Sequence, residues 1–315
     1  MGKPAFITVL VLACMAWAFC SSIYSANVGN PDGKGDRVKA TVSKSAASAP
    51  VPPIAYHGGP VMVGEIHLYY IWYGNWSGNT AQAILTDFGT NIGSSPYFQI
   101  NTTYYQNSAS PQYVTGPVRY LGSTADNYSQ GTSLTDASVQ TIVSSAIASG
   151  ALPNDSKGIY FVLTSADVNE TSGFCTQYCG WHTFGTISNS NIKYSFIGNS
   201  DRCPSACEEQ TSVSPNANTG ADGMVSIMAH ELSETVTDPD LNAWYDSSNP
   251  PQENGDKCAW NFGTTQTASN GSKYNIALGA RQYLIQQMWL AGGGCAMSAP
   301  GVAPAPPTGL TSTTN

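Results

Sequence analysis

One short stretch of the sequence carries the residue types, at the spacing, that metal-dependent hydrolysis requires. His230, Glu231 and Glu234 stand in the order H-E-x-x-E, one residue different from the H-E-x-x-H motif of zinc peptidases. On a helix, residues four apart share one face at about 6 Å, so His230 and Glu234 could hold one ion. Glu231 would stand beside the metal-bound water as general base and catalytic residue. The motif therefore predicts a metal site, with zinc as the cofactor.

A catalytic zinc needs a third protein ligand, and the sequence offers several. Asp240 lies ten residues after His230, Asp238 lies two residues before Asp240, and His182 follows a cysteine-rich loop. We treat Asp240, Asp238 and His182 as the candidates. The alternative is that His230 and Glu234 bond only to each other and form a structural pair.

The region around the motif is unusually acidic. Residues 222–256 contain eight carboxylates and no Lys or Arg. Such a density of oxygen ligands suits calcium outside the cell, but the spacing is not that of an EF-hand loop. We therefore expect a solvated acidic face. The eight are Asp222, Glu231, Glu234, Asp238, Asp240, Asp246, Glu253 and Asp256.

The N-terminus has the pattern of a secretory signal. Lys3 supplies the basic start, Ala5 to Phe19 is largely apolar, and small residues follow up to Ala26. The apolar run is shorter than the ~20 residues that a bilayer requires, so it predicts cleavage rather than an anchor. We expect residues 1–26 to be the signal peptide, and the mature chain to be extracellular with no membrane insertion.

Cysteine usage agrees with export. Six cysteines remain after the signal, and an even number in an exported chain indicates disulfides rather than a four-thiolate zinc site. Pairing within each of two C-x-x-x-C segments is the simplest expectation. The pairs would be Cys175–Cys179, Cys203–Cys207 and Cys258–Cys295.

Six N-x-S/T sequons also mark candidate glycosylation sites at Asn75, Asn101, Asn127, Asn154, Asn169 and Asn270.

Composition divides the rest of the chain. Residues 27–53 lack aromatics and are rich in Ser, Ala, Pro and Gly, which predicts a disordered linker or a removable pro-segment. Residues 299–315 predict a disordered Pro-rich tail. Residues 54–298 are left to form one domain.

Hydrophobic periodicity within that domain alternates between the strand and helix types. This predicts an α/β or α+β fold, in which a mixed sheet is packed by helices around a zincin-like motif helix, with disulfide-closed loops at 165–215. The predicted strands are 61–73, 114–121, 158–164 and 192–198, the predicted helices are 79–92, 134–148 and 222–237, and 283–290 is a strand or short helix. Thr219 or Asp222 is the expected N-cap of the motif helix.

Charge and aromatic content limit the partners. Charged residues are only 10% of the chain and the net charge is −8, which excludes a nucleic-acid-binding surface. Trp72, Tyr73 and Trp76 could stack on sugars, although packing in the core explains them more simply. A cell-wall polysaccharide or an extracellular protein is therefore the expected partner.

Several further motifs occur in order across residues 54–295. They are Tyr56–Met62 (YHGGPVM), Tyr69–Gly74 (YYIWYG), Asp87-Phe88, Ser94–Pro96 (SSP), Gly173–Cys175 (GFC), Cys179–His182 (CGWH), Ala221–Met224 (ADGM), Ala229–Leu232 (AHEL) with Glu234, and Asn242–Tyr245 (NAWY). Together they resemble the plant EXORDIUM-like family, also called the phosphate-induced proteins. Familiar members have Asn-Pro-Leu where this chain has Asp238-Pro239-Asp240, so it is similar to a divergent member.

The resemblance implies a secreted protein of the apoplast or cell wall that takes part in growth or in hormone- and nutrient-dependent signalling. It implies no particular reaction. Two alternatives stay open at this point: a zinc-dependent extracellular hydrolase of the peptidase type that uses the HELSE helix, and a carbohydrate-binding module.

Overall fold

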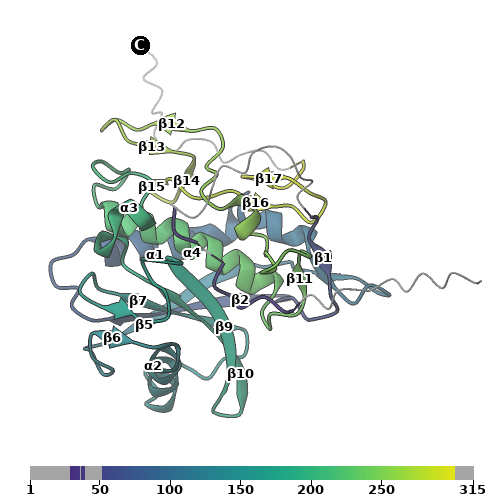
Figure 1. Cartoon of the computed structure of the whole chain (residues 1–315), viewed down its shortest axis with the longest axis horizontal. Helices are drawn as coiled ribbons and strands as arrows, with labels where there is room; N and C mark the ends of the chain where they lie inside the picture. The colour runs from purple at the N-terminus through teal and green to yellow at the C-terminus, as the bar shows by residue number, and fades with distance from the viewer. Residues whose placement is uncertain (1–28, 36, 40–51, 302–315) are drawn as a thin grey trace, which may run out of the picture.

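The computed structural model describes residues 29–35, 37–39 and 52–301 (Figure 1). The predicted signal peptide lies outside these residues, as do most of the predicted tail and much of the predicted linker. None of the helices within them combines the length and the apolar character that a membrane span requires.

A mixed sheet of five strands forms the centre of the molecule. Its strands are β2 (Ile66–Tyr73), β5 (Val118–Asp126), β7 (Gly158–Thr164), β9 (Gly180–Ile187) and β10 (Ser190–Ile197). They lie in the order β5-β2-β7-β10-β9. The first four run parallel, and β9 pairs antiparallel to β10. The predicted mixed sheet is therefore confirmed, and β9 is an edge strand.

Helices cover both faces of the sheet, as parallel strands require. Helices α1 (Ala81–Asn91) and α4 (Thr219–Thr237) lie on one face, and α2 (Asp136–Ala148) lies on the other (Figure 1). The structure therefore has the mixed α/β class in a single domain. Short elements connect these parts: β1 (Ala55–Tyr56), η1 (Ile92–Ser94), η2 (Phe98–Thr103), β3 (Tyr105–Gln106), β4 (Gln112–Tyr113), β6 (Ser133–Leu134), β8 (Asn169–Glu170), η3 (Ser200–Arg202), α3 (Pro204–Cys207), β11 (Trp244–Tyr245), η4 (Asp256–Cys258), β12 (Gln266–Thr267), β13 (Lys273–Tyr274), β14 (Ile276–Leu278), β15 (Arg281–Tyr283), β16 (Met288–Trp289) and β17 (Cys295–Ala296).

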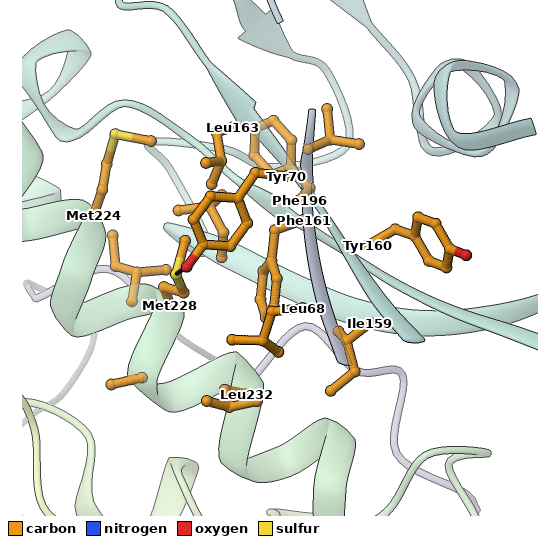
Figure 2. Packing of buried hydrophobic residues seen from close by; sticks show 14 of the residues in the cluster. Leu68, Tyr70, Ile159, Tyr160, Phe161, Leu163, Phe196, Met224, Met228 and Leu232 are labelled. Carbon is orange, nitrogen blue, oxygen red and sulfur yellow. Dashed lines mark hydrogen bonds between the residues drawn. The ribbon is translucent and has the colours of Figure 1, made fainter. Parts of the chain in front are cut away.

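The sheet and α4 share the main hydrophobic core. Phe161 of β7 points toward α4, while Tyr160 points to the opposite side of the sheet (Figure 2). The Tyr70 hydroxyl lies 3.3 Å from the sulfur of Met228 on α4. C-terminal hairpins cover the other side of the helix (Figure 1), and every residue from 220 to 237 is consequently buried. Charged residues of α4 therefore face protein on all sides rather than water.

Some element boundaries differ from the prediction. The first strand begins at Ile66 rather than residue 61, because the backbone of Met62 instead bonds to Val236 at the end of α4. The N-cap of α4 is Asn218, whose side chain accepts a hydrogen bond from the Ala221 amide. The 283–290 segment holds the end of β15 and all of β16 rather than one element, and β9 had no predicted counterpart.

Three disulfides close the loops, but two of the expected pairs are wrong. Cys175 bonds to Cys203 and Cys179 bonds to Cys207, each across 28 positions. The two C-x-x-x-C segments lie beside each other, so each cysteine meets the other segment rather than its own neighbour. The third pair, Cys258–Cys295, is confirmed.

Part of the predicted linker packs on the domain. Residues 29–35 and 37–39 are ordered against it, unlike the disordered segment that their composition predicts, and Pro31, Gly33, Gly35 and Val38 are buried. The contacts come from the buried Pro31 and Val38 as well as from glycines and backbone hydrogen bonds, and a segment with so few apolar residues gave no sign of them in its composition.

The three aromatic residues that could stack on sugars lie in the core instead. Trp72, Tyr73 and Trp76 are only 5%, 0% and 6% exposed. They therefore offer no open ring face to a carbohydrate.

Breaking the Cys258–Cys295 bond should destabilise the domain. The bond joins residues 37 positions apart, and a loop of this size gives roughly 3–4 kcal/mol by restricting the unfolded chain. We expect the Cys258→Ala/Cys295→Ala variant to lose about that much unfolding free energy in urea, measured with EDTA present so that metal does not contribute. A loss below about 1 kcal/mol would contradict this account.

Candidate metal centre

The motif residues of α4 lie at its C-terminal half, where the helix is wholly enclosed. His230, Glu231 and Glu234 are each 0% exposed. His230 Nε2 lies 2.8 Å from Glu234 Oε1, one helical turn away. The predicted shared face is therefore confirmed.

His182 enters the same space from β9. Its Nε2 lies 3.3 Å from Glu253 Oε2 and 3.7 Å from Glu234 Oε2. Burial lowers the pKa of His182 to about 4. The imidazole is therefore neutral at physiological pH, which is the form that binds a metal.

Glu253 and Asp256 come from a loop folded around a buried ion pair. Lys257 Nζ lies 2.6 Å from Asp246 Oδ2, and the other oxygen of Asp246 accepts a hydrogen bond from the Gln252 amide at 2.9 Å. This fold brings the Asp256 amide within 3.1 Å of Glu234 Oε1 and Asp256 Oδ1 within 3.8 Å of His230 Nε2.

Gly255 is the residue that permits this close approach. A Cβ atom at this position would lie 2.6 Å from His230 Nε2 and 2.8 Å from Glu234 Oε1. Any side chain would push the loop away from α4. Glycine therefore belongs to the construction of the site although it offers no ligand atom.

These residues form two overlapping sets of metal-ligand type. One contains His182, Glu234 and Glu253, and the other contains His230, Glu234 and Asp256; within each set the ligand atoms lie within 4.8 Å of one another. Glu234 belongs to both. Imidazole nitrogen and carboxylate oxygen are the donors that zinc accepts in catalytic sites.

The electrostatics of the cluster also fit a cation. Burial raises the pKa of Glu253 well above its ordinary value, and the charge of Glu234 adds to the effect. The pKa of Asp256 is raised for the same two reasons. Among the described residues, Glu234 Oε2, Glu253 Oε1 and Asp256 Oδ1 accept no hydrogen bond. Buried oxygens normally have partners, and a divalent cation would supply one to each.

Glu231 lies beside the cluster rather than within either set. A Cβ on Gly180, the first residue of β9, would stand 3.4 Å from Glu231 Oε1, so this carboxylate faces the start of the edge strand. Its negative charge contributes to the raised pKa of Glu253, which places the two groups near each other. Glu231 is therefore near the cluster, and its role as a base stays a prediction.

Comparison with known proteins identifies the family. Residues 54–295 match the phosphate-induced protein 1 conserved region. The chain belongs to this family. It is 33% identical to Protein EXORDIUM-like 3 of Arabidopsis thaliana, over 81% of this chain and 85% of that protein. It is 32% identical to Protein EXORDIUM-like 5 of Arabidopsis thaliana, over 78% and 77%.

Protein PHOSPHATE-INDUCED 1 of Nicotiana tabacum is 29% identical over 61% of this chain and 67% of that protein. No solved structure matches the chain. The resemblance to the EXORDIUM-like family is thus confirmed, while the candidate metal centre rests on the geometry of this structure.

Two of the three candidates for the third metal ligand, Asp240 and Asp238, lie outside the cluster. Asp240 accepts a hydrogen bond from Asn191 at 3.0 Å and pairs with Lys193 at 3.2 Å, outside both sets. Asp238 accepts the amides of Asn242 and Ala243, each at 2.6 Å, and so holds the turn that ends α4. The helix stops at Thr237 and the chain turns away, so the ligand prediction for Asp240 is wrong. His182 does belong to the cluster.

Sequence reasoning missed Glu253 and Asp256 as candidate ligands. Both stand in the acidic stretch, for which we expected a solvated face, and this expectation is also wrong. Apart from Asp240, its carboxylates are largely or fully buried. The density of carboxylates without a basic residue was the signal that could have indicated a cation site.

One predicted glycan site conflicts with the fold. Asn101 is 0% exposed, and its side chain lies between Ser233 and Asn254. A glycan has no room there in the folded chain. Asn75, Asn127, Asn154 and Asn270 are exposed and Asn169 is partly so, and glycosylation at these five stays a prediction.

Removing the metal should destabilise the protein. We expect the protein purified without chelators to contain about one zinc-type ion per chain. An ion present at 100 times its dissociation constant adds about 2.7 kcal/mol, which corresponds to a fall in Tm of roughly 5–10 °C with EDTA. Calorimetry with EDTA, and then with added zinc to restore the Tm, checks this. Identical melting in all three conditions would contradict a resident metal.

A matched pair of variants should separate the ligand from the residue that only looks like one. Asp256→Asn removes a carboxylate from the cluster, whereas Asp240→Asn makes the same change outside it. We expect Asp256→Asn to weaken zinc affinity beyond the about 10–100-fold cost of outer-shell changes, and Asp240→Asn to leave it unchanged. Titration with a competing chelator measures both. Equal effects would argue against the assignment of Asp256.

Proposed function

We propose that this family member is a secreted metal-dependent hydrolase of the peptidase type. The observation that supports it best is the convergence of five ligand-type side chains from α4, β9 and the 246–256 loop beside the buried Glu231. A merely structural His230–Glu234 pair would not require Glu253, Asp256 and His182 to gather around it.

The residues would divide the work as follows. His230, Glu234 and Asp256 would hold the ion, with His182 and Glu253 on the other side of Glu234. A bound zinc would supply an acidified water and a Lewis acid for a carbonyl group. Glu231 would be the general base toward that water and the general acid toward a leaving amine. Enclosure by α4 and β9 keeps the dielectric low, which strengthens each of these interactions.

The same proposal has a physiological setting. Three disulfides and the predicted signal peptide support export. The family membership supports the apoplast or cell wall as the location, and growth or hormone- and nutrient-dependent signalling as the process. An extracellular protein is favoured over a polysaccharide as partner, because the aromatics that suggested sugar binding are buried.

Substituting the base should abolish hydrolysis without loss of metal. Glu231→Gln keeps the shape of the side chain but cannot accept the proton, so we expect the rate on a library of quenched fluorescent peptides to fall by about 10²–10⁴-fold. His230→Ala should lose both metal and activity. The proposal fails if the zinc-loaded wild-type protein cleaves nothing, or if Glu231→Gln cleaves as fast as the wild type.

A further inference from the structure

At one of the two edges of the central sheet, that of β9, the chain's own N-terminal segment lies beside the start of the strand. Strand β9 has β10 on one side only. On its other side, the His182 amide donates a hydrogen bond to the Gly33 carbonyl at 3.0 Å. The segment therefore satisfies one amide of an edge that is otherwise open for pairing with an added peptide.

Two glycines bring this segment against the metal cluster. A Cβ on Gly33, whose φ is +68°, would lie 2.1 Å from the His182 carbonyl oxygen. A Cβ on Gly35 would lie 2.0 Å from Asp256 Oδ1. Both neighbours are residues of the cluster, so the backbone of the segment passes directly over it and tolerates no side chain at these two positions.

The residue between the glycines enters a pocket suited to a cation. Lys34 Nζ lies 2.7 Å from Asp136 Oδ2 and 2.7 Å from Ser172 Oγ. It also lies 5.3 Å from the ring centre of Tyr178 and 5.9 Å from that of Trp181, within cation–π range. The ammonium group thus has an anion, a hydroxyl and two aromatic faces.

The pocket is built from several elements and is braced from behind. Asp136 begins α2, and Ser172 follows β8. The Ser172 hydroxyl contacts Asp136 Oδ1 at 2.7 Å and Glu170 Oε2 at 3.0 Å, and Glu170 is only 1% exposed. Tyr178 donates its hydroxyl to the same Glu170 oxygen. The ion pair itself lies at the surface, with Lys34 23% and Asp136 51% exposed, but the groups behind it are held by the buried Glu170.

We propose that the edge of β9 is a binding groove for peptides of the form small–basic–small, with the basic side chain in the Asp136–Ser172 pocket. Residues Pro31–Gly35 are its tethered occupant, and a free peptide must displace them. The inference deepens the proposed function, on which it rests, by naming the substrate class of the same site. The binding contacts themselves are to backbone, Asp136 and Ser172, and none is to a metal.

Tethering sets the size of the expected effect. An attached ligand has an effective concentration of about 1 mM, so it would weaken a free peptide with a Kd near 100 µM by about tenfold. Variants that detach the N-terminal segment from β9, here called opening variants, should remove this competition. Lys34→Glu places a carboxylate against Asp136, and Gly33→Val places a side chain against the His182 carbonyl.

The test measures binding of acetyl-Asn-Pro-Asp-Gly-Lys-Gly-amide to the full chain in EDTA. We expect both opening variants to bind it at least about tenfold more tightly than the wild type. Lys39→Glu is the matched control, because it makes the same charge change where Lys39 pairs with Glu209 at 2.7 Å, and it should behave as wild type. A peptide with norleucine in place of lysine should bind the opened chains at least tenfold more weakly.

Hydrogen exchange of the His182 amide reports whether the segment has left the edge of β9. Faster exchange in both opening variants shows that the segment has left, and an opened groove that binds no peptide then overturns the proposal. Unchanged protection in both variants overturns it too, because Lys34 and Gly33 would not hold the segment. Equal binding of the norleucine and lysine peptides would contradict recognition of a basic side chain by the Asp136–Ser172 pocket. Because EDTA is present throughout, these results stand apart from failure of the metal-dependent hydrolase.

Discussion

The fold depends on how it compensates charge at the buried end of α4. A helix enclosed by the sheet below and by hairpins above carries His230, Glu231 and Glu234, each of them 0% exposed. Burying such groups costs several kcal/mol each unless they are paired. The surrounding parts supply some partners: β9 brings His182 to Glu234, the Asp256 amide bonds to Glu234, and Gly255 allows the approach. The same loop adds the carboxylates of Glu253 and Asp256, whose pKa values are raised by burial and by the charge of Glu234, so the cluster is left in need of a cation. Much of the chain outside the sheet can be understood as the scaffold of this one arrangement.

Local patterns predicted the elements well, because their evidence lies within a few residues. The apolar run of β7 (Gly158–Thr164) matched to the residue, and the motif helix differed only at its start. Strand β9 was not predicted, because only half of its side chains are buried and it lies between a cysteine loop and a hairpin turn. Its burial pattern is set by α4, a partner more than thirty positions away in the sequence.

Only part of the site could be predicted from the sequence, again because only local evidence is visible there. His230 and Glu234 are fixed by helical geometry, and His182 was a reasonable candidate by residue type. Asp256 was not, because its place depends on the Asp246–Lys257 pair and on a glycine, neither of which has a motif. Asp240 was one of three candidates, chosen for its spacing from His230, and spacing fails as a guide once the helix ends at Thr237. The disulfide pairs failed similarly, since two adjacent segments can be joined within or between themselves.

The position of one disulfide links distant parts of the chain to the metal centre. Cys258 closes the short helix η4 that begins with Asp256, and its partner Cys295 belongs to the last hairpin strand. The orientation of a ligand carboxylate is thus anchored from near the C-terminal end of the domain. We therefore expect a substitution in that hairpin to shift Asp256 through the disulfide, without a direct contact to the carboxylate. The C-terminal hairpin thus takes part in holding the candidate metal centre in place.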